Sequence, residues 1–403
     1  MVDWLNTTLG EVVKKGNGKI QTGPFGSQLH AYDYVVSGIP CIMPTNLKRN
    51  RLDLTGIAFI SEKDAQRLAQ HLVREGDIVY SRRGDVTQKA LIRKGEAGYF
   101  CGTGCLLVRA GNAIDPEFLT YHLSTLSNTD WIVSQAVGAH MPNLNTGILA
   151  KVPLRVPSLT EQKEIAAVLS VLDAKMDLNN RINAELEALA KTIYDYWFVQ
   201  FDFPDANGRP YKSSGGAMIW NDALKREIPA GRDWTSGNLS DAIQLAYGKP
   251  LKELDRSGAG FPVMGSNGIV GYHKVFLVEG PGIVVGRKGT AGAISFSHEN
   301  FFPIDTTYYV LPRRNYGFNF LLHLLQSLPL TKLNSDSAVP GLNRDNALRL
   351  PVLLPPDDLV KKYDTLTNAF AAKLKGVLYE NRELARLRDW LLPLLMNGQV
   401  RVK

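Results

Sequence analysis

Two short basic segments are the residues of this sequence whose types and spacing best suit contact with a polyanion. Ser81-Arg82-Arg83-Gly84 and Gly286-Arg287-Lys288-Gly289 each follow a short apolar run that is typical of a strand. Arginine can donate two parallel hydrogen bonds to guanine O6 and N7 or to a phosphate, and glycine lets the backbone approach a phosphate closely. A solvated turn with surface charges is the alternative interpretation. The candidate DNA contacts in and beside these segments are Arg82, Arg83, Lys89, Arg287, Lys288 and Thr290.

Other polar loops contain side chains that could read a base. Asparagine and glutamine are the amides that pair with adenine N6 and N7, and lysine can contact a phosphate. Turn formation by glycine and asparagine explains the same loops equally well, so both interpretations stay open. The candidates in these loops are Gln28, Asn46, Lys48, Asn267 and Lys274.

The sequence lacks the motifs that common catalytic mechanisms need. The segment 286–289 is glycine-rich and basic, but it lacks the Gly-Lys-Ser/Thr of a phosphate-binding loop. The sequence contains no Gly-x-Ser-x-Gly, no His-Glu-x-x-His and no Asn/Asp-Pro-Pro-aromatic tetrapeptide of the kind that an amino-methyltransferase needs. Cys101 and Cys105 lie four residues apart without a nearby histidine or second cysteine pair, which favours reduced structural thiols over metal ligands. We predict no catalytic residue and no metal site in this chain.

Length and composition describe an ordinary globular protein of two or three domains. The chain has 403 residues, of which 44% are hydrophobic and 21% charged, and a formal net charge of +7. A mildly basic balance permits binding to nucleic acid without establishing it. We expect no membrane span, because no run of about 18 apolar residues occurs. The absence of a secretory signal and the presence of three cysteines predict a cytoplasmic location.

The chain carries an internal tandem repeat. Pro142, Leu144 and Asn145 recur as Pro340, Leu342 and Asn343, and the same spacing continues through the helical region that follows. The two basic segments also correspond, because Arg82 and Gly84 match Arg287 and Gly289. The framework repeats while the loops differ, which is the pattern of one scaffold that carries two different binding surfaces.

Each copy ends in a long predicted helix. Apolar residues recur every three or four positions after Pro157 and again after Pro355-Pro356, over about 35–40 residues in each case. One apolar stripe of this length favours an antiparallel coiled coil of the two helices, although two unrelated amphipathic helices are the alternative. Asn183 and Asn381 fall on or near the stripe, where a polar residue either sets the register or lies at a solvated edge. The residues expected at the helix-pair or partner interface are Leu169, Leu172, Leu186, Leu189, Ile193, Phe370, Leu384, Leu387 and Leu391.

These patterns predict a mixed α/β fold with pseudo-twofold symmetry, in which two long antiparallel helices separate two globular domains. A Gly/Ser/Pro-rich tract connects the two copies. The predicted boundaries are 1–152 for the first globular domain, 153–201 for the first helix, 202–233 for the connecting segment, 234–352 for the second globular domain and 353–403 for the second helix.

The order of these parts resembles that of the DNA-specificity subunits of type I restriction–modification systems. The resemblance covers the whole length and is most specific in the tract from Asn207 to Gly216, in the opening Trp4…Leu9-Gly10-Glu11, and in the approach to the first helix at 142–157. The second copy departs from the pattern at its helix entry, where Pro355-Pro356-Asp357-Asp358 replaces the Thr160-Glu161-Gln162 type of start.

The resemblance implies a non-catalytic DNA-reading subunit of a larger enzyme. Each target-recognition domain would read one half of an asymmetric bipartite site in double-stranded DNA, and the helices would set the spacing between the halves. Two adenine-N6 methyltransferase subunits would dock on the chain and two restriction subunits would join through them. The family's cofactors, S-adenosylmethionine, ATP and Mg²⁺, would be bound by those partners and not by this chain.

Three other functions are compatible with the residues. The chain could be the specificity partner of a fused restriction–methylation enzyme of the Type II kind, which would change only the partner. It could be a protein–protein scaffold without DNA contact, or a hydrolytic or transfer enzyme with an unrecognised site. The salt dependence of DNA binding separates a DNA reader from a scaffold.

Overall fold

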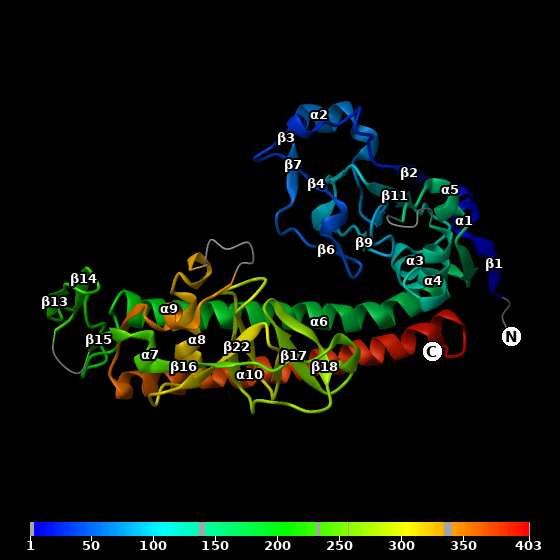
Figure 1. Cartoon of the computed structure of the whole chain (residues 1–403). Helices are drawn as coiled ribbons and strands as arrows, with labels where there is room; N and C mark the ends of the chain where they lie inside the picture. Colours follow the sequence, from blue (N-terminus) through cyan, green and yellow to red (C-terminus); the bar gives the residue numbers. More distant parts are fainter. Residues whose placement is uncertain (1–3, 137–141, 231–233, 257, 334–340, 403) are drawn as a thin grey trace. The chain divides into compact units, whose positions relative to one another are not determined.

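The computed structural model describes residues 4–136, 142–230, 234–256, 258–333 and 341–402 (Figure 1). The chain forms two compact units. Unit 1 comprises Met1–Asp177 with Arg382–Lys403, and unit 2 comprises Leu178–Asn381. Both units combine sheets with helices, so the prediction of a mixed α/β fold is confirmed.

Unit 1 is built around a four-stranded antiparallel sheet. The strands lie in the order β2 (Lys19–Thr22), β11 (Cys105–Arg109), β8 (Ile78–Ser81) and β9 (Lys89–Leu91). Successive side chains of a strand point to opposite faces. Ile78 and Tyr80 therefore join one hydrophobic cluster and Val79 joins another, which explains why β8 reads as a continuous apolar run.

Smaller elements complete unit 1. A second sheet has the order β10 (Phe100–Cys101), β4 (Ile39–Ile42), β7 (Ala58–Ile60) and β3 (Tyr34–Val35), and β1 (Leu5–Thr8) pairs with β12 (Pro153–Val156). Strands β5 (Leu47–Lys48) and β6 (Arg51–Leu52) form a hairpin whose two turn residues, Arg49 and Asn50, have φ angles of 48° and 65°. The helices are α1 (Leu9–Lys15), α2 (Glu62–Arg67), α3 (Pro116–His122), α4 (Leu126–Gln135) and α5 (Thr146–Ala150).

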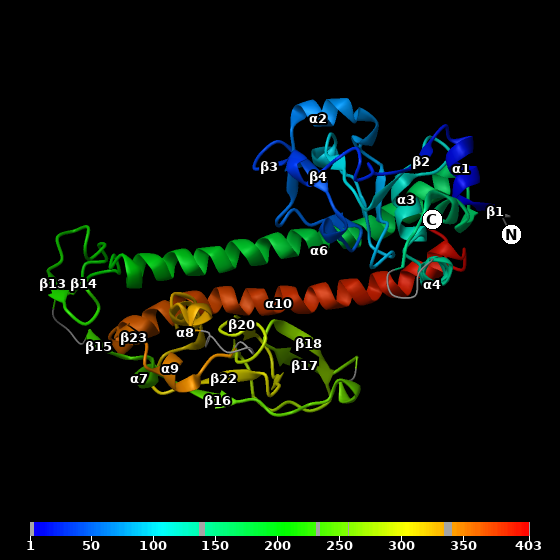
Figure 2. The same ribbon diagram turned by 45° about the horizontal axis from the view of Figure 1, so that its top comes forward.

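Unit 2 has a four-stranded sheet with the same order of corresponding strands. The order is β16 (Ile243–Tyr247), β22 (Thr307–Pro312), β19 (Gly282–Gly286) and β20 (Ile294–Ser297), again antiparallel (Figure 2). A second sheet contains β18 (Gly268–His273), β17 (Phe261–Gly265) and β21 (Phe302–Pro303), and β15 (Thr235–Asn238) pairs with β23 (Pro351–Leu354). The helices of this unit are α7 (Leu239–Ala242), α8 (Phe318–Gln326) and α9 (Arg344–Leu348).

The segment predicted to connect the two copies contains its own hairpin. Strands β13 (Met218–Asn221) and β14 (Arg226–Pro229) pair in it. Single turns of 3₁₀-helix complete the secondary structure, at Ala31–Asp33, Pro44–Asn46, Ala69–His71, Lys94–Glu96, Glu253–Asp255 and Leu330–Lys332.

Two long helices, α6 (Leu159–Tyr194) and α10 (Asp357–Met396), have 36 and 40 residues. One π-helical turn, Asp195–Val199, follows α6. Each helix starts a few residues after the predicted domain boundary, because strands β12 and β23 come first. None of the described helices is long and apolar enough to cross a membrane.

The two helices run antiparallel within unit 2. The Asn179 amide nitrogen donates to Asn381 Oδ1 at 2.8 Å, whereas Tyr363 Oη donates to the carbonyl of Ala190 at 3.0 Å. Moving from Asn179 to Ala190 along α6 therefore corresponds to moving back from Asn381 to Tyr363 along α10, as in an antiparallel pair. Asn381 also donates to Asn180 Oδ1 at 2.9 Å, so of the two interpretations left open for this residue the polar contact between the helices is the one that the structure has.

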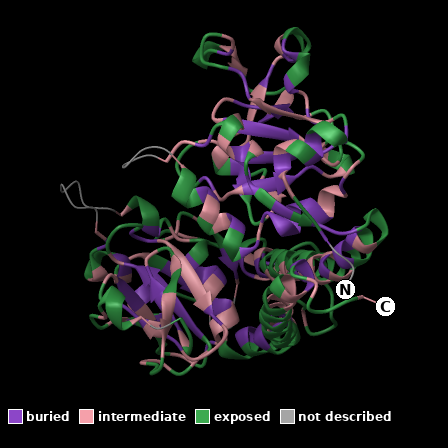
Figure 3. Ribbon diagram, turned by 90° about the vertical axis from the view of Figure 1, so that its right-hand side faces the viewer, coloured by how far each residue is buried: buried purple, intermediate pink, exposed green. Residues whose placement is uncertain are grey.

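Burial along the helices is uneven. Buried residues gather in the strands of each unit, while much of the long helices is exposed (Figure 3). In unit 1, Leu169 is fully buried beside Leu395 and Met396. Of the residues predicted at the helix-pair or partner interface, Leu189 and Leu387 are exposed. The half-buried ones are Leu172, Leu186, Ile193, Phe370, Leu384 and Leu391.

The three cysteines are free thiols inside unit 1. Cys41, Cys101 and Cys105 are all buried. Burial raises the pKa of the Cys41 thiol to about 12, so it stays protonated near neutral pH. This agrees with the structural role predicted for the cysteines.

Candidate nucleic-acid interface

The two basic segments lie in corresponding loops of the two units. We call residues 82–88, between β8 and β9, basic loop 1, and residues 287–293, between β19 and β20, basic loop 2. In loop 1 the Arg82 amide donates to the Gly104 carbonyl at 2.8 Å, and the Arg82 carbonyl accepts from the Leu144 amide at 2.8 Å. The backbone of loop 2 is anchored in the same way.

The anchors of basic loop 2 match those of loop 1 residue by residue. The Arg287 amide donates to the Thr306 carbonyl at 2.8 Å, and the Arg287 carbonyl accepts from the Leu342 amide at 2.9 Å. Gly84 and Gly289 each have a φ angle of 75°, and a side chain at either position would have open space around it. The left-handed backbone, and not crowding, therefore selects glycine at this point of both loops.

The repeated Pro-x-Leu-Asn motif holds both loops in place. Its second residue pairs with the loop, through a bridge between Arg83 and Asn143 in unit 1 and between Lys288 and Gly341 in unit 2. Its asparagine caps the following helix, since Asn145 Oδ1 accepts from the Ile148 amide at 2.8 Å and Asn343 caps α9 in the same manner. The motif thus has a structural role that fixes where the basic side chains emerge.

Basic loop 1 combines arginines with an exposed aromatic ring. The Arg82 guanidinium carbon lies 5.8 Å from the centre of the Phe25 ring, which is 54% exposed. Arg82 is half-buried, and its Nε has no hydrogen-bond partner among the described residues. Arg83 is exposed. Arginine beside an open aromatic face is an arrangement that can stack on a base and bind a phosphate.

Basic loop 2 lies beside a tyrosine flanked by two arginines. The guanidinium carbons of Arg287 and Arg344 lie 5.1 Å and 5.4 Å from the centre of the Tyr247 ring, which is 49% exposed. Arg287 also donates to the Asp305 carbonyl at 3.0 Å. A hydrogen bond to the Asp345 carboxylate raises the pKa of Arg344, so it stays charged. Tyr247 and Arg344 were not among the DNA contacts predicted from the sequence, although Arg344 directly follows the repeated Pro-x-Leu-Asn motif.

Most of the other predicted contacts are at the surface. Lys48 is exposed and forms an ion pair with Asp53. That hydrogen bond is the main cause of the lowered pKa of the Asp53 carboxyl. Gln28 is half-buried, and its Oε1 accepts from the Phe25 amide at 3.1 Å, so it shapes the turn that presents Phe25. The predicted DNA contacts of unit 2 that are exposed are Asn267, Lys274, Lys288 and Thr290.

Two predicted DNA contacts, Asn46 and Lys89, are buried and are withdrawn from the candidate set. The Asn46 side chain accepts from the Met43 amide at 3.0 Å and donates to the Asp53 carbonyl at 2.9 Å, so its amide is already used within the fold. Lys89 is the first residue of β9 and not part of the loop, and all three residues of β9 are buried, so its side chain does not emerge with those of the loop. Burial lowers the pKa of the Lys89 ammonium to about 7.

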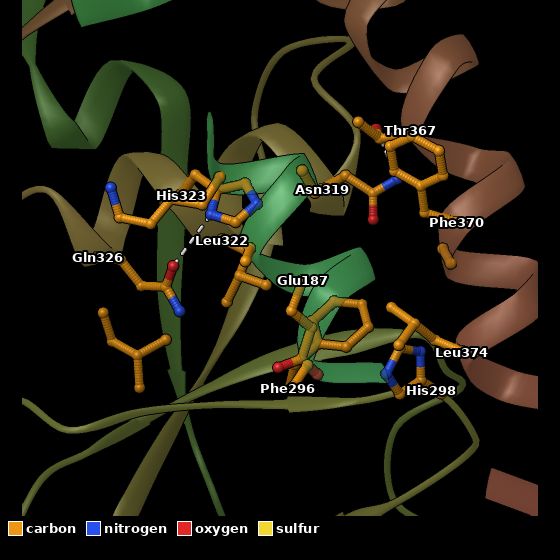
Figure 4. Close-up of a pocket in the computed structure, with 16 residues that line it drawn as sticks. Glu187, Phe296, His298, Asn319, Leu322, His323, Gln326, Thr367, Phe370 and Leu374 are labelled. Carbon is orange, nitrogen blue, oxygen red and sulfur yellow. Dashed lines mark hydrogen bonds between the residues drawn. The ribbon is translucent and has the colours of Figure 1, made fainter. Parts of the chain in front are cut away.

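A cavity of about 520 Å³ lies in unit 2, apart from the basic loop (Figure 4). Side chains from α6, α8, β20 and α10 line it, and Phe296, Leu322 and Phe370 form apolar walls. Burial lowers the pKa of His298 and His323, which favours neutral imidazoles, and it raises the pKa of Glu187. The lining gives no cluster of positive charge, so this cavity does not suit a nucleic-acid backbone.

Comparison with known proteins identifies one family. Residues 1–188 match the family described as the type I restriction modification DNA specificity domain. The chain is 22% identical over 402 residues to the specificity subunit of the type I restriction enzyme MjaIX of Methanocaldococcus jannaschii, across 92% of this chain and 89% of that protein. It is 21% identical over 476 residues to the HindI specificity subunit of Haemophilus influenzae, across 99% of this chain and 100% of that protein.

A solved structure shares the fold. The crystal structure of the S subunit of a type I restriction–modification system from M. genitalium aligns with a TM-score of 0.57 and 19% sequence identity, covering 98% of this chain and 96% of that one. These matches agree with the resemblance carried by the opening Trp4…Leu9-Gly10-Glu11, the approach to the first helix at 142–157 and the tract from Asn207 to Gly216. Residues 1–188 therefore match the type I restriction–modification DNA specificity domain, and the chain over most of its length is similar to type I specificity subunits.

Proposed function

We propose that this chain is the non-catalytic DNA-reading subunit of a type I restriction–modification enzyme, and that each unit reads one half of a bipartite site. One observation carries the proposal: both units hold a basic loop on the same strand of the same sheet, with equivalent backbone anchors. A loop that is anchored at its base can present arginine side chains with fixed geometry, which bidentate recognition of a base requires.

The two half-sites are expected to differ in sequence. The side chains at matched positions are unlike, since Arg83 corresponds to Lys288, and the neighbouring aromatic residue is Phe25 in unit 1 and Tyr247 in unit 2. Arginine offers a planar fork, whereas lysine offers a mobile point charge. An asymmetric site follows from this difference in chemistry.

The proposal also assigns a spacing role to the helices. We infer a tandem repeat with pseudo-twofold symmetry, in which α6 and α10 form a coiled coil that fixes the distance between the half-sites. At 1.5 Å per residue, helices of 36 and 40 residues are about 54–60 Å long. That length is enough to relate two half-sites one helical turn of DNA, about 34–36 Å, apart.

The catalytic partners are proposed to dock on the helices. Exposed apolar side chains support this, because Val171 and Trp390 of unit 1 are 65% and 62% exposed. Two methyltransferase subunits would bring S-adenosylmethionine and methylate an adenine in each half-site. Two restriction subunits would bring ATP and Mg²⁺ through them.

The deciding experiment is co-expression with a methyltransferase subunit of the type I family, followed by mapping of methyladenine in genomic DNA. The expected result is a split asymmetric motif with methyladenine in both halves. Inserting one helical turn into both α6 and α10 is expected to lengthen the gap between the half-sites and leave the half-sites themselves unchanged. A folded complex that methylates no motif and shows no salt-dependent binding to DNA would instead favour a protein scaffold.

A further inference from the structure

A second pocket, in unit 1, surrounds the buried amine of Lys89. Its volume is about 240 Å³, and its lining comes from the β5–β6 turn, the end of basic loop 1, strand β9 and helices α3, α4 and α10. Lys89 lines it while only 4% of the residue is exposed. The side-chain amine of a nearly buried lysine therefore borders an open pocket that a small molecule could enter.

The Lys89 amine has no anionic partner in the described part of the chain. In these residues no hydrogen bond or ion pair joins its Nζ to an oxygen. The Nζ atom lies 5.7 Å from the centre of the Tyr80 ring. The Tyr80 hydroxyl is itself buried without a hydrogen-bond partner among the described residues. A buried ammonium without a partner is unfavourable, so the charged form of Lys89 is favoured only when an anion lies beside it.

The other charged groups at the pocket do not supply that counter-charge. Arg388 donates to Asp173 Oδ1 at 2.9 Å and to Asp389 Oδ1 at 2.8 Å, and Tyr121 Oη donates to Asp173 Oδ2 at 2.6 Å. Both carboxylates are thus engaged by Arg388 and Tyr121. Arg49, in the β5–β6 turn, also lines the pocket and adds a second cation beside Lys89. With Lys89 protonated, the cations Lys89, Arg49 and Arg388 outnumber the carboxylates of Asp173 and Asp389 by one, so the charged groups at the pocket carry a net charge of +1.

The equivalent position in unit 2 shows that the fold does not require an amine here. Lys89 pairs with Tyr80 across β8 and β9, and in the corresponding strands Ile294 pairs with Val285. Ile294 lines the cavity of unit 2, so the same place in the sheet carries an apolar side chain there. A lysine at this position is therefore found in unit 1 and not in unit 2, and the sheet can form without it.

We propose that this pocket binds a small oxyanion of the phosphate class between Lys89 and Arg49. The site is additional to DNA reading by the basic loops and does not depend on it. Because burial lowers the pKa of Lys89 to about 7, the amine is largely neutral at pH 8, and entry of an anion draws a proton onto it. Anion binding is thus linked to proton uptake, and the number of protons taken up can be measured in addition to the heat of binding.

The test is calorimetric titration of the full chain with sulfate at pH 8, in two buffers of different ionisation enthalpy. Sulfate carries no titrating proton near neutral pH, so any proton taken up goes to the protein. We expect saturable binding with uptake approaching one proton. Lys89→Ile, which installs the residue found in unit 2, is expected to weaken binding at least tenfold and to abolish proton uptake. Lys63→Ile, which removes an exposed charge on α2, is expected to bind as the wild type does.

Equal binding in the wild type and Lys89→Ile, or saturation without proton uptake, would overturn the proposal. A second arm, competition with a short duplex in the same calorimeter, identifies the source of the oxyanion. Displacement of sulfate by DNA assigns the site to a backbone phosphate, and retention of sulfate on the DNA-bound protein assigns it to a free phosphate-class ion. Failure of the anion site leaves DNA binding intact, so the two proposals fail separately.

Discussion

The Arg287 guanidinium carbon lies 5.1 Å from the centre of the Tyr247 ring, and Arg344 approaches the same ring to 5.4 Å. These three residues are far apart in the sequence and belong to β16, basic loop 2 and α9. The ring holds two cations at an exposed position, which is a geometry suited to a stacked base beside a phosphate. Several expectations about DNA binding follow from this cluster and its counterpart in unit 1.

Arg287→Ala is expected to weaken binding to the cognate site by about 1–3 kcal/mol and to relax sequence choice in one half-site only. The reason is that the guanidinium can make two hydrogen bonds to one base, and alanine makes none. Titration of duplexes mutated in either half measures this. Lys252→Ala, an exposed charge of unit 2 outside the loop, is the matched control. Equal loss of discrimination in both halves would contradict the one-unit, one-half assignment.

Arg83→Ala and Lys288→Ala are each expected to lower the slope of log affinity against log salt by about 1, without changing sequence preference. Both side chains are exposed at the tip of a basic loop, where phosphate contact releases counter-ions. Affinity measured at a series of salt concentrations checks this. An unchanged slope in both variants would remove the loop tips from the DNA interface.

Asn381→Ala is expected to destabilise the chain by about 1–3 kcal/mol, because it leaves the buried amide of Asn179 with one hydrogen bond fewer. Asn183→Ala is the matched control, since the buried Asn183 Oδ1 has no hydrogen-bond partner among the described residues. Urea unfolding of the two variants compares them directly. Equal destabilisation would show that the contact between Asn179 and Asn381 contributes nothing specific.

Unit 1 is expected to lose stability as the pH falls from 6.5 to 4. Burial lowers the pKa of His122 to about 4, and its Nε2 accepts a hydrogen bond from the Arg155 amide at 3.2 Å. Above pH 6.5 the imidazole is neutral in both states, so its contribution is complete. Below that pH the unfolded chain binds a proton that the folded chain refuses, and about 3 kcal/mol is lost by pH 4.

His122→Gln is expected to flatten this part of the pH profile, because glutamine keeps a hydrogen-bond acceptor and cannot be protonated. The free energy of unfolding at pH 7 and pH 5 gives the comparison. His30→Gln, at an exposed position, serves as the control and should keep the slope of the wild type. A parallel slope in the His122 variant would show that another group titrates.

Sequence reasoning succeeded where the cause is local. A strand followed by a glycine that needs a positive φ, and an asparagine that caps a helix, are properties of a few adjacent residues. The equivalence of basic loops 1 and 2 could therefore be predicted from matched spacing. The mixed α/β fold and the long helices were predictable for the same reason, since periodicity is a local pattern.

Other predictions depended on which way a side chain points. Lys89 follows the basic segment in the sequence, yet it belongs to β9, whose two faces are both buried, so the fold covers its side chain. Asn46 was predicted to contact adenine, but its side-chain amide accepts a hydrogen bond from the Met43 amide and donates one to the Asp53 carbonyl. Asn381 contacts Asn179 and Asn180 across the helix pair, a pairing that depends on the register of the two helices and therefore on packing along their length.

By itself the sequence determined the repeat, the elements and the correspondence of the two basic loops, since each follows from patterns of neighbouring residues, whereas the anchors of the loops are contacts with residues distant in the chain. Only the tertiary structure decided which side chains share a site. Tyr247, Arg287 and Arg344 meet because three strands of one sheet and a short helix bring them together, and Lys89 reaches a pocket because five further elements close around it. Contacts between residues distant in the chain depend on the packing of the whole unit, and no local pattern encodes them.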